Sequence, residues 1–233
     1  MAKADEIISN IKAKLAELGI ARSTRGTIKR EVTESVLPTE RQMMEDFIIK
    51  NFGIFNPWDD AITKLPNAAG NYVFLLKKNT TLPMKGIDNT PVFHDIEING
   101  KEYQILYTGI ASKSLRQRIG KNHFGENAGR STLRLSLGSL MGFTKIYRDG
   151  NGKHLKLKTA DEQRMTEWMQ RNLVVLFYAN SNCKDDEEKM IVTLNPPLNL
   201  DKNHCSENAG FRAELSHLRS KKVNFKPITE GNV

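Results

Sequence analysis

A strand that leads into a helix with an inward-facing arginine is the first place in this chain where side chains could do chemistry. Residues 103–110 alternate in character and include the sequence Tyr-Thr-Gly, which predicts a short β-strand. Ser112 then suits the N-cap of a helix whose Leu115 and Ile119 face the core. Arg118 lies three residues after Leu115, so its guanidinium sits at the edge of that packed face. The arrangement is a candidate site for an anion.

Two further residues, Tyr72 and Glu187, are candidate parts of the same site. Residues 70–76 have the pattern of a strand, so the phenols of Tyr72 and Tyr107 can point to the same face of adjacent antiparallel strands. Glu187 extends the apolar stripe of a predicted helix, which continues through Met190, Ile191 and Leu194. A carboxylate on such a face needs a partner, and a divalent cation is a natural one.

Each of these four residues also has a purely structural interpretation. Tyr72 and Tyr107 could fill a core, as most tyrosines in strands do. Arg118 could be an ordinary surface residue of its helix. Glu187 could be one of several acidic residues that the helix dipole favours near an N-terminus.

The composition is that of a basic globular protein. Of the 233 residues, 39% are hydrophobic and 27% are charged, so the chain can bury a substantial core. The formal net charge of +8 favours a polyanionic partner, most often nucleic acid and less often an anionic membrane surface. Cys183 and Cys205 lack the spacing of metal ligands, and neither a signal peptide nor a membrane-spanning run is visible. We therefore expect free thiols, a cytoplasmic location and no membrane partner.

The N-terminal part is expected to be helical, with a basic linker. Apolar residues recur at helical spacing over residues 5–18, and residues 21–36 are rich in arginine and lysine. Residues 39–42 have the pattern of a capping box, which predicts a second helix from that point. Residues 52–67 are predicted to form a loop with a short helical turn, in which Trp58 packs against the N-terminal helices.

The rest of the chain contains further predicted strands and helices. Residues 92–98 and 101–110 flank Asn99-Gly100, which is a strong signal for a hairpin turn. Residues 173–178 are apolar throughout, which is typical of a strand buried on both faces. Helices are predicted at four more places: from Ser131, over residues 161–171, over residues 184–194 and around residues 219–222.

In this order, the pieces resemble the GIY-YIG nuclease superfamily. Gly70-Asn71-Tyr72 stands where the first name motif has Gly-Ile-Tyr, and Tyr107-Thr108-Gly109 stands where the second has Tyr-Ile-Gly. Leu115-x-x-Arg118 matches the arginine helix, with one extra residue after the glycine. Glu187 matches the acidic helix, and Pro196-Pro197-Leu198-Asn199 matches its usual exit. The likeness covers about residues 69–200, and it departs from the pattern at both central isoleucines and in the longer span between the two tyrosines.

The resemblance implies hydrolysis of a phosphodiester bond by water. Arg118 would hold the non-bridging phosphate oxygens, and Glu187 would bind one Mg²⁺ (or Mn²⁺) that stabilises the leaving oxygen. One tyrosine would orient or deprotonate the water, with Tyr72 favoured as the base and Tyr107 as the residue that orients water or phosphate. His123 lies one residue away from a histidine of some restriction-type members, and could assist the nucleophile or cap its helix. Asn199 could hydrogen-bond within the site or serve as an ordinary turn residue.

The implied fold is α+β, with a small, mainly antiparallel central sheet flanked by helices and a helical N-terminal extension. We expect the extension with its basic linker at residues 1–66 and the GIY-YIG-like nuclease domain at residues 67–200. A basic C-terminal helix and tail would occupy residues 201–233.

The expected partner is double-stranded DNA. Basic elements flank the core without a long separate DNA-binding domain, which favours a restriction-type enzyme, and such enzymes often act as homodimers. Nucleic-acid contacts are expected from four cationic residues: Arg116, Lys121, Arg130 and Arg134. The alternatives are a repair or mobile-element nuclease, a non-catalytic nucleic-acid-binding protein on the same scaffold, and a structural or partner-binding protein.

Overall fold

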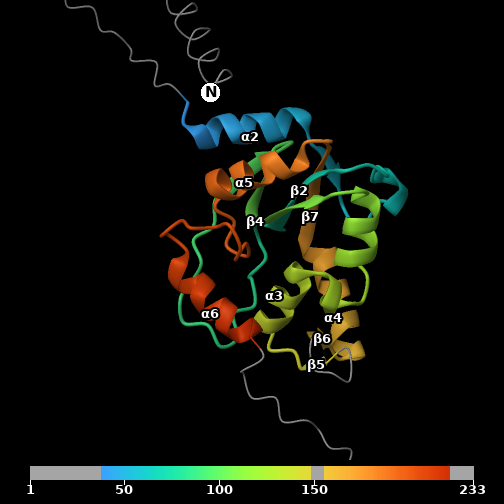
Figure 1. The fold of residues 1–233 in the computed structure, drawn as a ribbon, viewed down its shortest axis with the longest axis vertical. Coiled ribbons are helices and arrows are strands. Elements are labelled where there is room, and N and C mark those ends of the chain that lie inside the picture. Colours follow the sequence, from blue (N-terminus) through green and yellow to red (C-terminus); the bar gives the residue numbers. More distant parts are fainter. Residues whose placement is uncertain (1–37, 148–154, 221–233) are drawn as a thin grey trace, which may run out of the picture. The chain divides into compact units, whose positions relative to one another are not determined.

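A five-stranded antiparallel sheet organises the residues that the computed structural model describes, which are 38–147 and 155–220 (Figure 1). The strands stand in the order β1-β7-β2-β4-β3, and each neighbouring pair is antiparallel. Their bounds are β1 Gly53–Phe55, β2 Gly70–Lys77, β3 Asp95–Ile98, β4 Lys101–Ala111 and β7 Leu173–Ala179. The prediction of an α+β fold with a small antiparallel sheet is therefore confirmed, and β7 is an inner strand, as its apolar sequence indicates.

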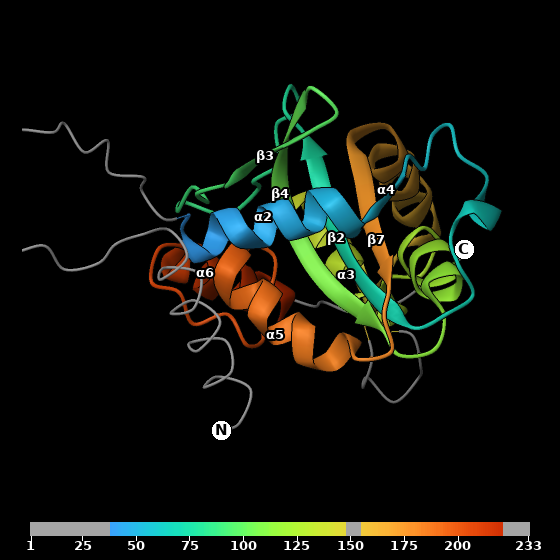
Figure 2. The ribbon, with the colours of Figure 1, turned by 90° about the horizontal axis from the view of Figure 1, so that it is seen from above.

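Helices cover both faces of this sheet (Figure 2). One face carries α2 (Glu40–Asn51) and α5 (Cys183–Leu194). The other face carries η2 (Arg116–His123), α3 (Thr132–Leu140), α4 (Thr159–Asn172) and α6 (Ala209–Arg219). Smaller elements are η1 (Ile62–Lys64), η3 (Ala128–Arg130) and a separate two-stranded sheet of β5 (Lys145–Tyr147) and β6 (Leu155–Leu157).

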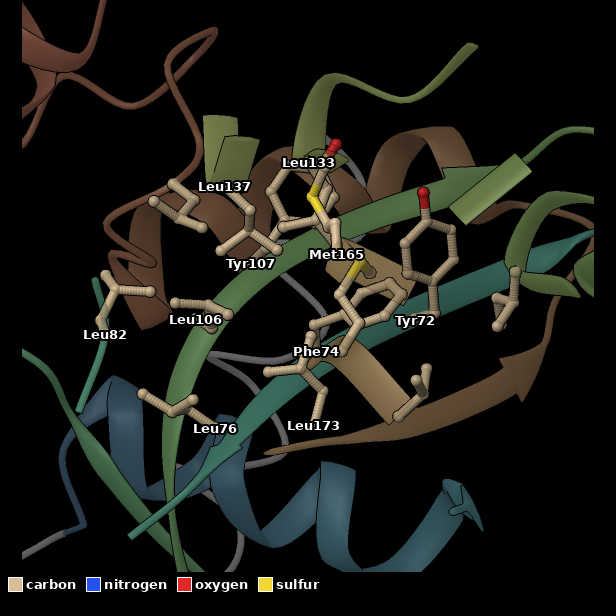
Figure 3. Close-up of a cluster of buried hydrophobic side chains, with 14 of the residues drawn as sticks. Tyr72, Phe74, Leu76, Leu82, Leu106, Tyr107, Leu133, Leu137, Met165 and Leu173 are labelled. Carbon is tan, nitrogen blue, oxygen red and sulfur yellow. The ribbon is translucent and has the colours of Figure 1, made fainter. Parts of the chain in front are cut away.

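Alternation along β2 divides the interior into two apolar cores. Tyr72 and Phe74 belong to the core beneath α3 and α4, where Figure 3 shows them beside Met165. Val73 and Leu75 belong to the core beneath α2 and α5. The predicted division of β2 into two faces is therefore confirmed. Tyr72 lies on the face that η2 covers.

A β-bulge in β4 decides which face Tyr107 occupies. The register steps from Phe74 opposite Tyr107 to Leu75 opposite Ile105, so Leu106 is an extra residue in β4. Strict alternation, as expected from the sequence, would place Tyr107 and Ile105 on the same face. Because the bulge shifts the phase by one residue, Tyr107 joins the core of Phe74 while Ile105 joins the opposite core.

The segment before β2 matches its prediction at the start of α2 and differs from it at β1 and at Trp58. The capping box is confirmed, since Thr39 and Gln42 bond each other's backbone N–H at the start of α2. Residues 52–67, expected to be a loop, contain β1, which pairs with β7. Trp58 is 56% exposed, and the guanidinium of Arg171 lies 5.3 Å from its ring, so its predicted role as a packing anchor is wrong.

Some predictions fall outside the described residues: the helix at 5–18, the linker at 21–36, and Lys221 and Lys222. The chain divides into two units, Met1–Leu37 and Pro38–Val233. α2, β1 and α6 belong to the second unit together with the sheet. Within the described ranges, no helix combines the length and the apolar character that crossing a membrane requires.

A buried ion pair ties α3 to α4. Arg134 is 0% exposed, and its Nε and Nη2 donate to Oε2 of Glu162 over 3.1 and 2.6 Å. Its Nη1 donates to the carbonyl oxygen of His123, over 3.0 Å. The other oxygen of Glu162 accepts the N–H groups of Ala128 and Leu157. Arg134 was predicted to contact nucleic acid, and that prediction is wrong, because its guanidinium is enclosed and fully engaged.

Removal of the Glu162 carboxylate should destabilise the fold. We expect Glu162→Ala to lower the free energy of unfolding by about 3–5 kcal/mol, because a buried guanidinium is left uncompensated. The matched control is Arg164→Ala, which removes an exposed cation paired with Asp161 in the same helix and should cost about 1 kcal/mol or less. Urea unfolding measures the free energy of unfolding of both variants. Equal losses would show that the buried pair contributes no more to stability than the exposed pair.

Candidate active site

The hydroxyl of Tyr72 is the point at which β2 and η2 meet. Tyr72 is 0% exposed, and its hydroxyl oxygen lies 2.8 Å from Nε2 of His123. Nε of Arg118 donates a hydrogen bond to the same oxygen over 3.2 Å. Burial, followed by the proximity of Tyr107, raises the pKa of Tyr72 well above that of an ordinary phenol. The phenol is therefore protonated and is held by two partners from one helix.

That helix is a π-helix rather than the expected α-helix. Hydrogen bonds in a π-helix join residues five apart, as the N–H of Phe124 and the carbonyl oxygen of Ile119 do over 3.0 Å. Arg118 and His123 are also five apart, so they lie on successive turns at the same side of the helix. The wider turn thus lets Arg118 and His123 reach the same target on β2.

The start of η2 also differs from its prediction. Ser114, and not Ser112, bonds the first turn, since its Oγ accepts the N–H of Gln117 over 3.1 Å. The strand β4 continues to Ala111, so the change from strand to helix takes only a few residues. Ser112 as the N-cap is therefore wrong by two residues.

His123 is buried and neutral. Burial, together with the charges of Arg118 and Arg134, holds the pKa of His123 well below its ordinary value. Its Nδ1 lies 2.7 Å from Oγ of Ser131, which is the N-cap of α3. Because the Tyr72 oxygen already accepts from Arg118, its hydroxyl can donate to Nε2 of His123, which leaves the ring proton on Nδ1 to bond Oγ of Ser131. His123 thus bonds both the Tyr72 hydroxyl and the N-cap of α3.

Tyr107 borders a cavity, in contrast to the enclosed Tyr72. The two ring centroids are 6.5 Å apart, so the tyrosines are neighbours, as predicted, and Figure 3 shows them on adjacent strands. Tyr107 is 9% exposed, and its hydroxyl lies 3.2 Å from Oγ1 of Thr132. The cavity has a volume of about 160 Å³ and is called the Glu187 cavity. Its lining includes Tyr107, Thr132, Glu187, Asn199, Lys202 and Arg219.

Glu187 reaches this cavity from α5 and already has a cationic partner. Its side chain is 18% exposed, and its Oε2 accepts a hydrogen bond from Nζ of Lys202 over 3.1 Å. After burial and Tyr107, Glu187 also contributes to the raised pKa of Tyr72. Although α5 packs on the opposite face of the sheet, its Glu187 therefore shares a cavity with Tyr107 and lies close to the group formed by Tyr72, Arg118 and His123.

One carboxylate, that of Glu187, is the candidate ligand for a divalent cation at this cavity. In the part of the chain that the structure describes, no three His, Cys, Asp or Glu side chains form a group that could hold a metal ion. Mg²⁺ does not need such a group, because it keeps several waters and binds one or two carboxylates together with substrate phosphates. Glu187 can provide this carboxylate once the Lys202 ammonium moves aside, and Asp201 lines the same cavity.

Asn199 acts on the backbone of β4. Its Oδ1 accepts the N–H of Thr108 and its Nδ2 donates to the carbonyl oxygen of Thr108, both over 2.9 Å. Asn199 thus continues the pairing of β4 beyond the end of β3. Because both amide atoms are engaged in this way, the geometry favours a positioning role over the predicted catalytic one.

Asn71 fastens the helix that carries Glu187. It stands where the name motif has isoleucine, and its Nδ2 donates to the carbonyl oxygen of Cys183 at the start of α5, over 2.8 Å. Its Oδ1 accepts from Nδ2 of Asn180 over 3.0 Å. Both departures from the motif, Asn71 and Thr108, are therefore polar attachments that hold the site's elements together.

Two of the other residues predicted to contact nucleic acid are accessible to solvent. Lys121 and Arg130 are exposed. Arg130 lines a second cavity of about 580 Å³, called the arginine cavity. Its lining includes Arg118, Gly129, Arg130, Thr132, Leu155 and Arg219.

Arg116 does not match its prediction as a nucleic-acid contact. Its Nε and Nη2 donate to the carbonyl oxygens of Leu65 and Thr63, over 2.9 and 3.1 Å. These bonds hold the loop before β2 against η2. The geometry therefore favours a structural role.

Sequence reasoning missed three residues of the site: Ser131, Thr132 and Arg219. Ser131 was recognised only as a helix start, because a local pattern cannot show that its hydroxyl also bonds an imidazole. Arg219 was recognised only as part of a basic run. No spacing within the sequence relates it to the tyrosines.

The tautomer of His123 can be tested directly. At pH 6 an ordinary imidazole, with a pKa of about 6.5, is mostly charged. Because its pKa is lowered, His123 should stay neutral at that pH and carry its proton on Nδ1. Nitrogen-15 NMR of the histidine rings, assigned with His123→Gln, gives both the charge and the tautomer. A charged ring, or a proton on Nε2, would contradict the hydrogen-bond directions given above.

The comparisons with known proteins agree with this geometry. The model of the GIY-YIG catalytic domain matches residues 70–221, which is more than half of the chain. No curated protein and no solved structure matches the chain significantly. The family match runs from the first residue of β2 through α6, so it includes every strand and helix that contributes Tyr72, Arg118 or Glu187. The chain belongs to the GIY-YIG catalytic domain family.

Proposed function

We propose that this protein is a metal-dependent endonuclease that hydrolyses phosphodiester bonds in DNA. Membership of the family makes it a nuclease of the GIY-YIG type, and the metal and the DNA substrate are our extension. The observation that carries the proposal is that Arg118 and His123 both bond the hydroxyl of Tyr72 beside a cavity containing Glu187. The net charge of +8 suits a polyanionic substrate.

Proton transfer would use the Tyr72–His123 pair. A water molecule attacks the phosphorus in line, and the bond to the 3′ oxygen breaks. The water gives a proton to the Tyr72 oxygen while the phenol's own proton passes to Nε2 of His123, 2.8 Å away. The neutral imidazole matters because the raised pKa of Tyr72 disfavours a free phenolate. Tyr107, which borders the Glu187 cavity, would orient the water or the phosphate.

Arg118 would supply positive charge to the reacting phosphate. Its guanidinium lines the arginine cavity and can present a fork of N–H groups to the non-bridging oxygens. This contact would draw Arg118 away from Tyr72 and open the buried hydroxyl to water. Mg²⁺ (or Mn²⁺) at Glu187 would add Lewis-acid stabilisation of the leaving oxygen.

We further propose double-stranded DNA as the substrate and a restriction-type homodimer in the cytoplasm as the active form. Support for duplex DNA comes from the exposed Lys121 and Arg130, which lie on η2 and η3 close to the candidate site. The restriction-type role and the homodimer are supported by the resemblance in sequence alone.

Cleavage of supercoiled plasmid in the presence of Mg²⁺ tests the proposal. We expect Arg118→Ala and Glu187→Gln each to slow cutting by about 100-fold or more, as expected when preorganised charge at the transition state is lost. Lys101→Ala, which removes an exposed cation at the β3–β4 turn, should cut normally. Discrete fragments would support a restriction-type enzyme, whereas scattered nicks would favour a repair or mobile-element role.

Cutting that persists undiminished in both variants would refute the site assignment. Salt-sensitive DNA binding without cutting under any divalent metal would instead support the non-catalytic role. The Lys202 ammonium on Glu187 is the observation that favours this second function, because it stands where a metal would bind.

A double-variant comparison tests the proposed proton transfer. Tyr72→Phe and His123→Gln should each slow cutting by about 100-fold or more, as for loss of a general base. The double variant should be no slower than the slower single variant, because the transfer needs both groups. Thermal unfolding of each variant controls for damage to the core. Losses that multiply would show that the two residues act independently.

A further inference from the structure

Arg219 brings a second guanidinium to the cleft from an element far along the chain. It is the last residue of α6, and it lines both the arginine cavity and the Glu187 cavity. Tyr107 and Asp201 are close enough to act on its pKa, in the direction opposite to the lowering that burial causes. Arg219 therefore stands between the two cavities, beside one of the two site tyrosines.

The side chain of Arg219 makes no hydrogen bond and no ion pair with any residue that the structure describes. Other arginines with restricted exposure differ in this respect. Arg134 bonds Glu162, Arg116 bonds two carbonyl oxygens, and Arg212 bonds Asn195. A guanidinium that burial has partly dehydrated, and that makes no hydrogen bond within the described residues, is suited to bind an anion.

The cavity beside Arg219 is positively charged. Arg118, Arg130 and Arg219 all line it, and no carboxylate is among its described lining residues. Lys145 lies close enough to Arg219 that this charge, after burial, lowers the pKa of Lys145. Three guanidinium groups gathered in this way favour binding of an external anion even with Asp201 near Arg219, and about 580 Å³ offers ample room for a phosphate with its sugar.

The position of the cavity relates it to the scissile phosphate. Arg118 lines it on one side, and Thr132 and Arg219 are shared with the cavity of Glu187. A DNA strand carries one phosphate per nucleotide. Because the two cavities share Thr132 and Arg219, a strand whose scissile phosphate lies near Arg118 and Glu187 can place a neighbouring phosphate in the arginine cavity.

We propose that Arg219, with Arg118 and Arg130, forms a second phosphate-binding subsite that holds the DNA phosphodiester next to the one that is cut. The inference rests on the proposed function and adds to it a contact that fixes the register of the strand. Arg118 serves both phosphates, whereas Arg219 serves the neighbouring one.

Binding of a short DNA duplex in EDTA measures this contact without cleavage. Arg219→Ala should weaken binding about tenfold at moderate salt, as expected for loss of one charge-assisted contact. The slope of log K against log salt should fall by about one. Arg219→Lys keeps the charge and should restore the slope. Lys101→Ala is the matched control for loss of a cation outside the cleft and should change neither quantity.

A duplex with one neutral methylphosphonate separates a binding role from a structural one. Placed next to the mapped cut position, the neutral linkage should weaken binding by the unaltered protein about tenfold and binding by Arg219→Ala hardly at all. Equal weakening of both proteins would overturn the subsite. So would an Arg219→Ala variant that binds like Lys101→Ala while the unaltered protein cuts DNA, and in that case the proposed function stands. If the unaltered protein neither binds nor cuts, both proposals fall.

Discussion

The arrangement of the site depends on one constraint, which is that the buried hydroxyl of Tyr72 needs hydrogen-bond partners inside the core. A hydroxyl left unpaired there would cost about 1–3 kcal/mol, and Tyr72 avoids this penalty with Arg118 and His123. Both partners come from η2, so the bonds also set how that helix lies on the sheet. The geometry of a π-helix is what lets residues five apart share one target. The contacts that complete the core are therefore the same contacts that aim the phosphate-binding arginine.

Side-chain amides perform a second kind of positioning. Asn71 ties the start of α5 to β2, and Asn199 takes the place of a neighbouring strand along β4 at Thr108. Thr108 in turn donates from its hydroxyl to the carbonyl oxygen of Tyr72. Residues that depart from the family's usual isoleucines thus join segments that are far apart in sequence. The acid on α5 and the tyrosines on the sheet are held in register by these amides rather than by apolar packing alone.

The sequence predicts what depends on local periodicity and turn chemistry, and misses what depends on distant partners. The faces of β2, the Asn99-Gly100 turn and the capping box of α2 follow from such patterns and are found as expected. The order of motifs was enough to anticipate that the tyrosines, Arg118 and Glu187 meet. Burial of Arg134 could not be anticipated, because the carboxylate that permits it lies 28 residues away. The π-helix leaves no signature in residue types, and Arg219 approaches the site only through the packing of α6.

Because of the bulge at Leu106, the number of residues in β4 before Tyr107 decides which face of the sheet this tyrosine occupies. Side chains in a strand have only two orientations, so each residue added or removed exchanges inside for outside. Changes of two residues elsewhere in β4 preserve that parity, but loss of the single extra residue reverses it. The spacing between the hairpin turn and Tyr107 is thus as much a part of the motif as the tyrosine itself. Alignments that treat this strand as strictly alternating would place its two halves out of phase.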